Sequence, residues 1–90
     1  MRKRLIIHVF GKVQGVWFRK STQEKAEELN ILGFCQNMPN GTVYIEAEGE
    51  LENLKYFSDW CKIGPPMAEV SEIKVTEEAI EGFKAFEIRR

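Results

Sequence analysis

The sequence is poor in the residues that build metal or covalent sites. Among its 90 residues are two cysteines, Cys35 and Cys61, and one histidine, His8. Because two cysteines without a Cys-x-x-Cys pair frame neither a disulfide-stapled fold nor a zinc or thioredoxin site, we expect both thiols to be reduced and packed in or near the core. One histidine and no short acidic cluster offer no ligand set for zinc or magnesium. We therefore expect neither a metal nor a cofactor.

Long apolar runs and an excess of one charge are also missing. No segment reaches the length of a membrane-spanning helix, and the N-terminus lacks the apolar region of a signal peptide, so we expect a cytoplasmic protein that does not contact membranes. The 13 basic and 14 acidic residues give a net charge of −1, whereas broad nucleic-acid binding needs a clustered basic face. We expect no nucleic-acid partner. The length predicts one domain, residues 1–90, and we expect a monomer.

The most informative stretch is residues 11–19, which read Gly-Lys-Val-Gln-Gly-Val-Trp-Phe-Arg. It follows an apolar segment, residues 5–10, that is typical of a strand. After it, Ser21 and Glu24 have the spacing of a capping box, which predicts the start of a helix. A loop with two glycines can turn its backbone N–H groups inward, and the helix adds its positive end. The pattern predicts an anion site with Arg19 at the mouth of the helix.

Apolar periodicity predicts the other elements of the chain. Asn30 suits the left-handed conformation that ends a helix. In the third strand, alternation predicts that Val43 and Ile45 face inward and that Glu46 and Glu48 face outward. The predicted strands are residues 3–10, 33–36, 42–48, 70–77 and 83–88, and the predicted helices are residues 21–29 and 50–63.

The order β-α-β-β-α-β with a short final strand predicts an α+β fold of the ferredoxin-like type. This is a split βαβ sandwich, one antiparallel sheet with two helices on one face; an unrelated α+β sandwich is the alternative. In the ferredoxin-like arrangement the third strand lies between the first two, whose carboxyl ends share one edge of the sheet. The loop 11–19 and Asn37 leave those ends about 10 Å apart, across two strand spacings. The fold therefore brings Arg19 and Asn37 to one pocket.

The chemistry available in such a pocket is limited. The loop ends in an arginine but holds no cysteine nucleophile, and the sequence has neither a Walker loop nor a dinucleotide-binding glycine motif. An anion cradle, a fixed positive charge and a neutral amide can bind a phosphoryl group, spread its transition-state charge and orient a water. They supply no strong base. The substrate must then already be reactive, as a mixed carboxylic–phosphoric anhydride is.

These residues resemble the acylphosphatase family. Residues 11–19 look like its first signature, Gly-x-Val-Gln-Gly-Val-x-Phe/Tyr-Arg. Residues 33–37, Gly-Phe-Cys-Gln-Asn, with Gly-Thr-Val at 41–43 and Gly49, look like its second. Gly-Pro-Pro at 64–66 and Phe-Glu-Ile-Arg at 86–89 are similar as well. The resemblance covers essentially all 90 residues and implies one acylphosphatase-like domain.

The resemblance implies an enzyme, an acylphosphatase that hydrolyses small-molecule acyl phosphates to carboxylate and phosphate without a metal. It implies that Arg19 binds the phosphate and that Asn37 orients the attacking water. Cys35 and Gln36 stand where valine or alanine and a basic residue are common in the family, which makes the pocket rim less positive. The loop residues that it assigns to phosphate binding are Gln14, Gly15, Val16, Trp17, Phe18 and Arg19.

Some residues and functions keep a second interpretation. Trp17 either walls the pocket or packs on the loop, and Lys12 either adds positive potential or is a solvated loop residue. His8 is interpreted as a packing residue and Cys35 as a packed thiol. Two other functions are weighed: an RNA-recognition or regulatory module of the same fold, and an acylphosphatase-like domain of a larger carbamoyl-transferring protein.

Overall fold

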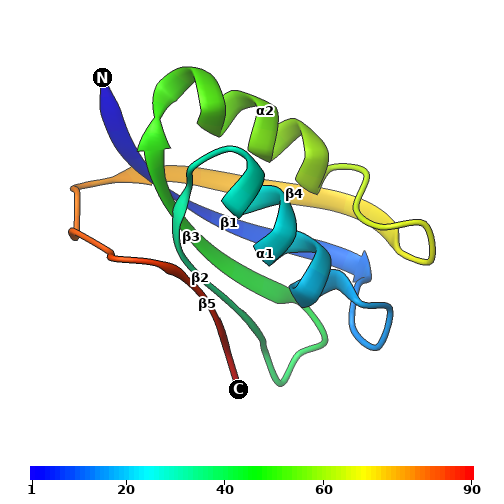
Figure 1. The fold of residues 1–90 in the computed structure, drawn as a ribbon. Coiled ribbons are helices and arrows are strands. Elements are labelled where there is room, and N and C mark those ends of the chain that lie inside the picture. Colours follow the sequence, from blue (N-terminus) through cyan, green and yellow to red (C-terminus); the bar gives the residue numbers. More distant parts are fainter.

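Five strands and two helices make up the computed structural model, which describes residues 1–90 (Figure 1). The strands are β1 (Arg2–Lys12), β2 (Leu32–Asn37), β3 (Val43–Glu50), β4 (Glu69–Glu78) and β5 (Phe86–Arg89), and the helices are α1 (Phe18–Glu28) and α2 (Leu51–Cys61). Their order along the chain is β1-α1-β2-β3-α2-β4-β5. This is the predicted βαββαβ order with a short C-terminal strand. No helix has both the length and the apolar character needed to cross a membrane.

One sheet carries all five strands in the order β4-β1-β3-β2-β5, and both helices lie on one of its faces (Figure 1). The predicted ferredoxin-like fold is confirmed, with β3 between β1 and β2. The β2–β5 pair is parallel, whereas the other three pairs are antiparallel. Val43, at the start of β3, pairs with Val9 on one side and with Asn37 on the other. The carboxyl ends of β1 and β2 therefore share one edge of the sheet.

The core lies between the helices and the sheet. Helix α1 buries Phe18, Thr22 and Ala26, which lie at helical spacing along one face. Cys35 and Cys61 are buried and free, in agreement with the expectation of reduced core thiols. Each fully buried large apolar side chain contributes about 1.5–3 kcal/mol of transfer free energy, so this layer holds the loop before α1 in a fixed position.

Helix α1 begins at Phe18 rather than at Ser21, and the prediction of a capping box is wrong. No side chain caps this helix; its N-cap is Trp17, in the left-handed conformation (φ 63°, ψ 20°). The N–H of Ser21 donates to the carbonyl oxygen of Trp17 at 3.0 Å, inside the first turn. Phe18 is buried against Trp60, with ring centroids 5.7 Å apart. Burial of Phe18 therefore outweighs the local capping signal. At the other end Asn30 has φ 56°, as predicted.

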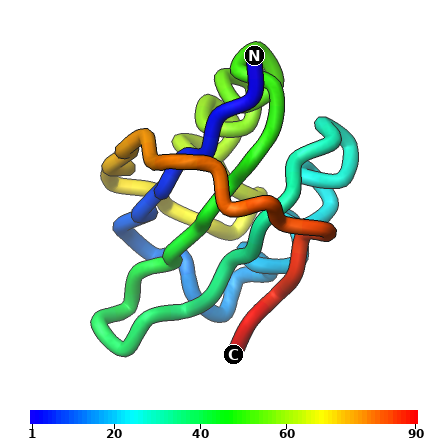
Figure 2. The backbone as a smooth tube through the Cα atoms, turned by 90° about the vertical axis from the view of Figure 1, so that its left-hand side faces the viewer, coloured from blue at the N-terminus to red at the C-terminus, as the bar shows by residue number.

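The prediction that Glu48 faces outward to solvent is also wrong, because this side chain is fully buried. The segment 79–85 runs from β4 to β5 at opposite edges of the sheet and passes over the end of β3 (Figure 2). N–H groups of Glu81, Gly82 and Phe83 donate to the Glu48 carboxylate, the latter two at 3.0–3.1 Å. Because Phe83 is held in this way, β5 begins at Phe86 rather than at residue 83.

Candidate active site

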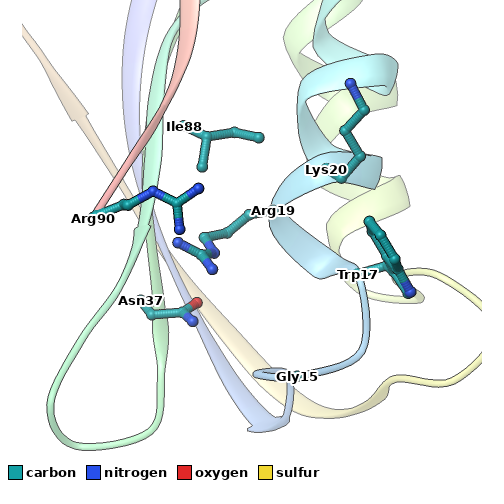
Figure 3. A pocket seen from close by; sticks show the side chains of 7 residues that line it. All are labelled: Gly15, Trp17, Arg19, Lys20, Asn37, Ile88 and Arg90. Atoms are coloured by element: carbon teal, nitrogen blue, oxygen red, sulfur yellow. The ribbon is translucent and has the colours of Figure 1, made fainter.

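A pocket of about 430 Å³ lies where the loop 13–17 leaves β1 and where β2 ends (Figure 3). The loop and the first turn of α1 contribute to it, β2 contributes its last residue, and the C-terminal segment contributes two residues. Arg19 and Asn37 both line this pocket, although they come from different elements. Its lining residues are Gly15, Trp17, Arg19, Lys20, Asn37, Ile88 and Arg90.

Arg19 extends from the first turn of α1 into the pocket. Its guanidinium group points toward Asn37 and Arg90 (Figure 3). Within the protein, the guanidinium group makes a long hydrogen bond from Nη1 to the carbonyl oxygen of Arg89, at 3.5 Å. It forms no ion pair. Most of the donors of Arg19 are therefore free to bind an anion in the pocket.

Asn37 ends β2 and presents its side-chain amide on the opposite side of the pocket. Its Oδ1 atom is buried and has no hydrogen-bond partner within the protein. Buried acceptors are nearly always paired, so an unpaired one beside a pocket calls for a donor from a ligand or a water. Asn37 is thus placed to accept a hydrogen bond from a molecule in the pocket.

The loop and the first turn of α1 expose a row of main-chain donors. The N–H groups of residues 14–20 donate to no other main-chain group, and no side chain caps the helix. Two of these residues have left-handed backbone angles: Gly15 (φ 72°) and Trp17 (φ 63°). Such angles turn successive N–H groups toward one side of the chain, which is how backbone anion cradles are built.

The first turn of α1 carries charges that oppose the helix dipole. It contains Arg19 and Lys20 and no acidic residue, whereas the first turn of α2 has the usual acidic residue, Glu52. Basic side chains at a helix N-terminus are unfavourable for the helix, because they add positive charge to its positive end. The same arrangement strengthens the binding of an anion there.

Gln14, predicted to bind phosphate, uses its side chain differently. Its Nε2 donates to the carbonyl oxygens of Met38 and Thr42, each at 2.9 Å. Both acceptors belong to the turn between β2 and β3, directly after Asn37. The side chain of Gln14 therefore links the loop to this turn, and its main-chain N–H is the donor that stays available for a ligand.

The other predicted loop residues differ in what they offer. Val16 and Phe18 point into the core, with 7% and 2% of their surface exposed, so only their N–H groups are available to a ligand. Trp17 is 77% exposed, and its ring turns away from Arg19 and Arg90 (Figure 3). It marks the margin of the pocket rather than packing on the loop. Lys12 is exposed and does not line the pocket.

Three lining residues, Lys20, Ile88 and Arg90, were missed by the sequence reasoning. Ile88 pairs with Cys35 because β5 lies parallel to β2, and this pairing brings the end of the chain to the pocket. Ile88 and Arg90 are two residues apart, so a strand places them on the same face. The sequence did not show which strand the last strand pairs with, and so did not place this face at the pocket. Lys20 follows Arg19 in the first turn of α1.

Cys35 lies directly behind the pocket. Its Sγ donates to the carbonyl oxygen of Arg19 at 3.6 Å. Burial raises the pKa of Cys35 to about 12, although the positive charge of Arg19 opposes this shift. The thiol is therefore neutral at physiological pH and packs beneath the helix start. No three His, Cys, Asp or Glu side chains gather into a metal-binding group.

Comparison with known proteins gives a consistent result. The acylphosphatase family model matches residues 5–88. The acylphosphatase of Acaryochloris marina is 48% identical over 82 residues, which cover 91% of this chain and 88% of that protein.

Solved structures agree with the family match. The crystal structure of the acylphosphatase from Bacillus subtilis covers all of both chains with 37% identity and a TM-score of 0.95. Full-length HypF, in its phosphate- and nucleotide-bound form, matches all of this chain over 12% of its own length, with 33% identity and a TM-score of 0.93. The chain belongs to the acylphosphatase family and is a hydrolase of acyl phosphates.

Proposed function

We propose that the family's reaction takes place in this pocket, with Arg19 and the loop N–H groups binding the phosphoryl group and Asn37 orienting the water. The observation that carries this proposal is the row of unpaired N–H donors at residues 14–20 beside an arginine without an ion pair. Neutral or apolar ligands would leave these donors unsatisfied, whereas a phosphoryl dianion matches them in charge and number.

Binding and catalysis use the same donors. In phosphoryl transfer the charge is spread over the equatorial phosphoryl oxygens, and fixed donors stabilise that charge without reorganising. The guanidinium of Arg19 contacts two such oxygens at once, and the N–H groups with the positive end of α1 hold the others. The chain's own cations thus supply the positive charge, and we propose hydrolysis without a metal.

Asn37 acts on the attacking water. Its free Oδ1 accepts one hydrogen of the water, which directs an oxygen lone pair toward phosphorus. A bond forms between the water oxygen and phosphorus as the bond from phosphorus to the acyl oxygen breaks. The water proton passes to a phosphoryl oxygen, and the carboxylate departs as an anion, so neither a general base nor a general acid from the protein is required.

We extend the proposal to the setting of the enzyme: residues 1–90 act as one acylphosphatase domain, as a cytoplasmic monomer without a nucleic-acid partner. The two free thiols support a reducing compartment. The surroundings of Tyr44 argue against an RNA-recognition role. On the face of the sheet that no helix covers, Tyr44 packs against His8 and Phe34, and its hydroxyl donates to Glu46 at 2.6 Å. Its ring is therefore engaged within the protein rather than free to stack on a base.

The binding step is tested by titrating ¹⁵N-labelled protein with inorganic phosphate and recording amide shifts by NMR. We expect saturable shifts at the amides of residues 14–20. Arg19→Gln should weaken binding strongly, whereas Lys84→Gln, which removes the same charge from an exposed site away from the pocket, should not. Shifts confined to other regions, or unchanged phosphate affinity in a folded Arg19→Gln variant, would contradict the proposal.

A further inference from the structure

The geometry points to a second anion subsite in the same pocket: Arg90 binds a negatively charged group on the acyl part of the substrate. The enzyme would then select acyl phosphates whose acyl group carries a carboxylate or a phosphate of its own. This inference rests on the proposed function, because it concerns the substrate of the same pocket.

The pocket brings two guanidinium groups side by side without an acidic side chain. Arg19 and Arg90 both line it, no acidic side chain does, and neither arginine forms an ion pair. A phosphoryl group carries at most about two negative charges near neutral pH. The loop N–H groups, the positive end of α1 and Arg19 already meet that charge, which leaves the guanidinium of Arg90 available for a second anionic group.

Arg90 differs from its neighbour Arg89, which is satisfied within the protein. Arg89 lies over the ring of Phe34, 3.8 Å from its centroid, and pairs with Glu87 at 3.6 Å. The guanidinium of Arg90 has neither kind of partner. It points instead into the pocket beside that of Arg19 (Figure 3). Two adjacent guanidinium groups repel each other, so an anion near both lowers the electrostatic free energy of the site.

The positions of the lining residues favour the acyl end for Arg90. In Figure 3, Gly15 and the loop lie at one end of the pocket and Ile88 at the other. The guanidinium of Arg90 lies between the Ile88 side chain and the guanidinium of Arg19. A phosphoryl group held by the loop donors occupies the Gly15 end. The acyl part then extends toward Ile88, a half-buried apolar side chain, and Arg90. Ile88 contacts the acyl carbons, and Arg90 binds the negatively charged group that is attached to them.

The test uses substrates that differ only in this charge. In 3- and 4-carboxybenzoyl phosphate a rigid ring carries a carboxylate, and the 3- and 4-carbamoylbenzoyl phosphates are neutral controls of the same shape. We expect the unmodified protein to favour the carboxylates by about tenfold in kcat/KM, mainly through KM, as a charge-assisted hydrogen bond would give. Arg90→Gln should bring this ratio close to one, and Arg90→Lys should restore part of it.

Lys84→Gln is the matched control, because it removes one exposed positive charge that does not line the pocket; it should keep the ratio of the unmodified protein. Equal kcat/KM for charged and neutral substrates in the unmodified protein would overturn the inference and leave the proposed function intact. An equal fall with both substrate types in Arg90→Gln would also overturn it, because Arg90 would then act on the transferred phosphoryl group. Failure to hydrolyse any of these substrates would overturn the proposed function as well.

Discussion

Gln14 donates a hydrogen bond from Nε2 to the carbonyl oxygen of Thr42 at 2.9 Å, and so ties the loop after β1 to the turn that follows Asn37. A second bond of the same length, to the carbonyl oxygen of Met38, fixes the direction of the carboxamide. In the proposed mechanism the loop binds the phosphoryl group, and the turn follows Asn37, which is proposed to orient the water. The distance between the two halves of the site therefore depends on a side chain that has no free donor for the substrate.

Replacing Gln14 by methionine, which keeps the length but cannot donate, should lower kcat by about tenfold or more, because positioning errors cost rate. Stability should fall by about 1–2 kcal/mol for the two lost bonds, as measured by urea unfolding. Inhibition by phosphate, which depends mainly on the loop, should change less than kcat. As a control, Gln23→Met removes a bond from α1 to Phe86 at 3.1 Å and should cost stability without the same loss of kcat. Unchanged kcat in Gln14→Met would refute this positioning role.

Glu48 should make the stability of the protein depend on pH. Burial raises its pKa, but hydrogen bonds from the N–H groups of Glu81, Phe83 and Gly82 outweigh burial and hold the pKa below the ordinary value of 4.5. Because the folded-state pKa is lowered, this stabilisation is fully present above pH 4.5 and is lost as the pH falls through the folded-state pKa. The urea midpoint of unfolding should therefore stay constant from pH 7 to about pH 4.5, as far as Glu48 determines it, and should fall as the pH is lowered further to 3.

Glu48→Gln should lose about 2–3 kcal/mol at pH 7, because an amide replaces a carboxylate that accepts several N–H groups, and its urea midpoint should vary less at low pH. Glu50→Gln is the control, since that carboxylate is exposed and pairs with the N-terminal ammonium group at 2.8 Å; its loss should matter far less. Equal losses in the two variants would show that the buried carboxylate does not anchor the segment 79–85.

Trp17→Gly should stabilise the protein by about 0.5–1 kcal/mol, because glycine adopts left-handed angles without the steric cost that tryptophan bears. Little packing is lost, since Trp17 is 77% exposed. Trp17→Ala removes the ring but keeps the unfavourable angle, so it separates the two effects. Thermal or urea unfolding should rank the glycine variant above the alanine variant; the reverse order would contradict the assignment of backbone strain to this residue.

Neither cysteine should react readily with iodoacetamide in the folded protein. Burial raises the pKa of the Cys35 thiol to about 12 and also raises that of Cys61. At pH 8 the reactive thiolate is therefore scarce, and both side chains are inaccessible. Mass spectrometry should find the native protein unmodified and the urea-unfolded protein alkylated at both positions. Rapid alkylation of the native protein would show that the helix start above Cys35 opens in solution.

The expectation that Arg19 and Asn37 share one pocket came from local patterns and from the order of the elements, and both residues line the pocket. A glycine-containing loop between a strand and a helix, and a residue at the end of the next parallel strand, must share one edge of a ferredoxin-like sheet. Arg19 and Asn37 therefore meet whatever the details of their packing. In the structure, Val43 of β3 lies opposite both Val9 of β1 and Asn37 of β2, so the ends of β1 and β2 share one edge of the sheet.

The parts that were mispredicted or missed depend on contacts between distant segments. Ile88 and Arg90 reach the pocket only because β5 pairs with β2, and no local sequence pattern predicts that pairing. Glu48 is buried by a segment that comes more than thirty residues later in the chain. The capping signal at Ser21 is a sound local rule, but the core contact of Phe18 outweighs it. In each case tertiary packing decides against the local preference.

We propose that Asn37 orients the water while Arg19 and the loop bind the phosphoryl group, and the hydrolysis of benzoyl phosphate by one variant distinguishes these roles. Benzoyl phosphate hydrolysis by Asn37→Ala, in the presence of EDTA, should show a kcat reduced by about 10²–10³, with phosphate inhibition close to that of the unmodified protein. A folded Asn37→Ala variant that retained the full kcat would contradict the account.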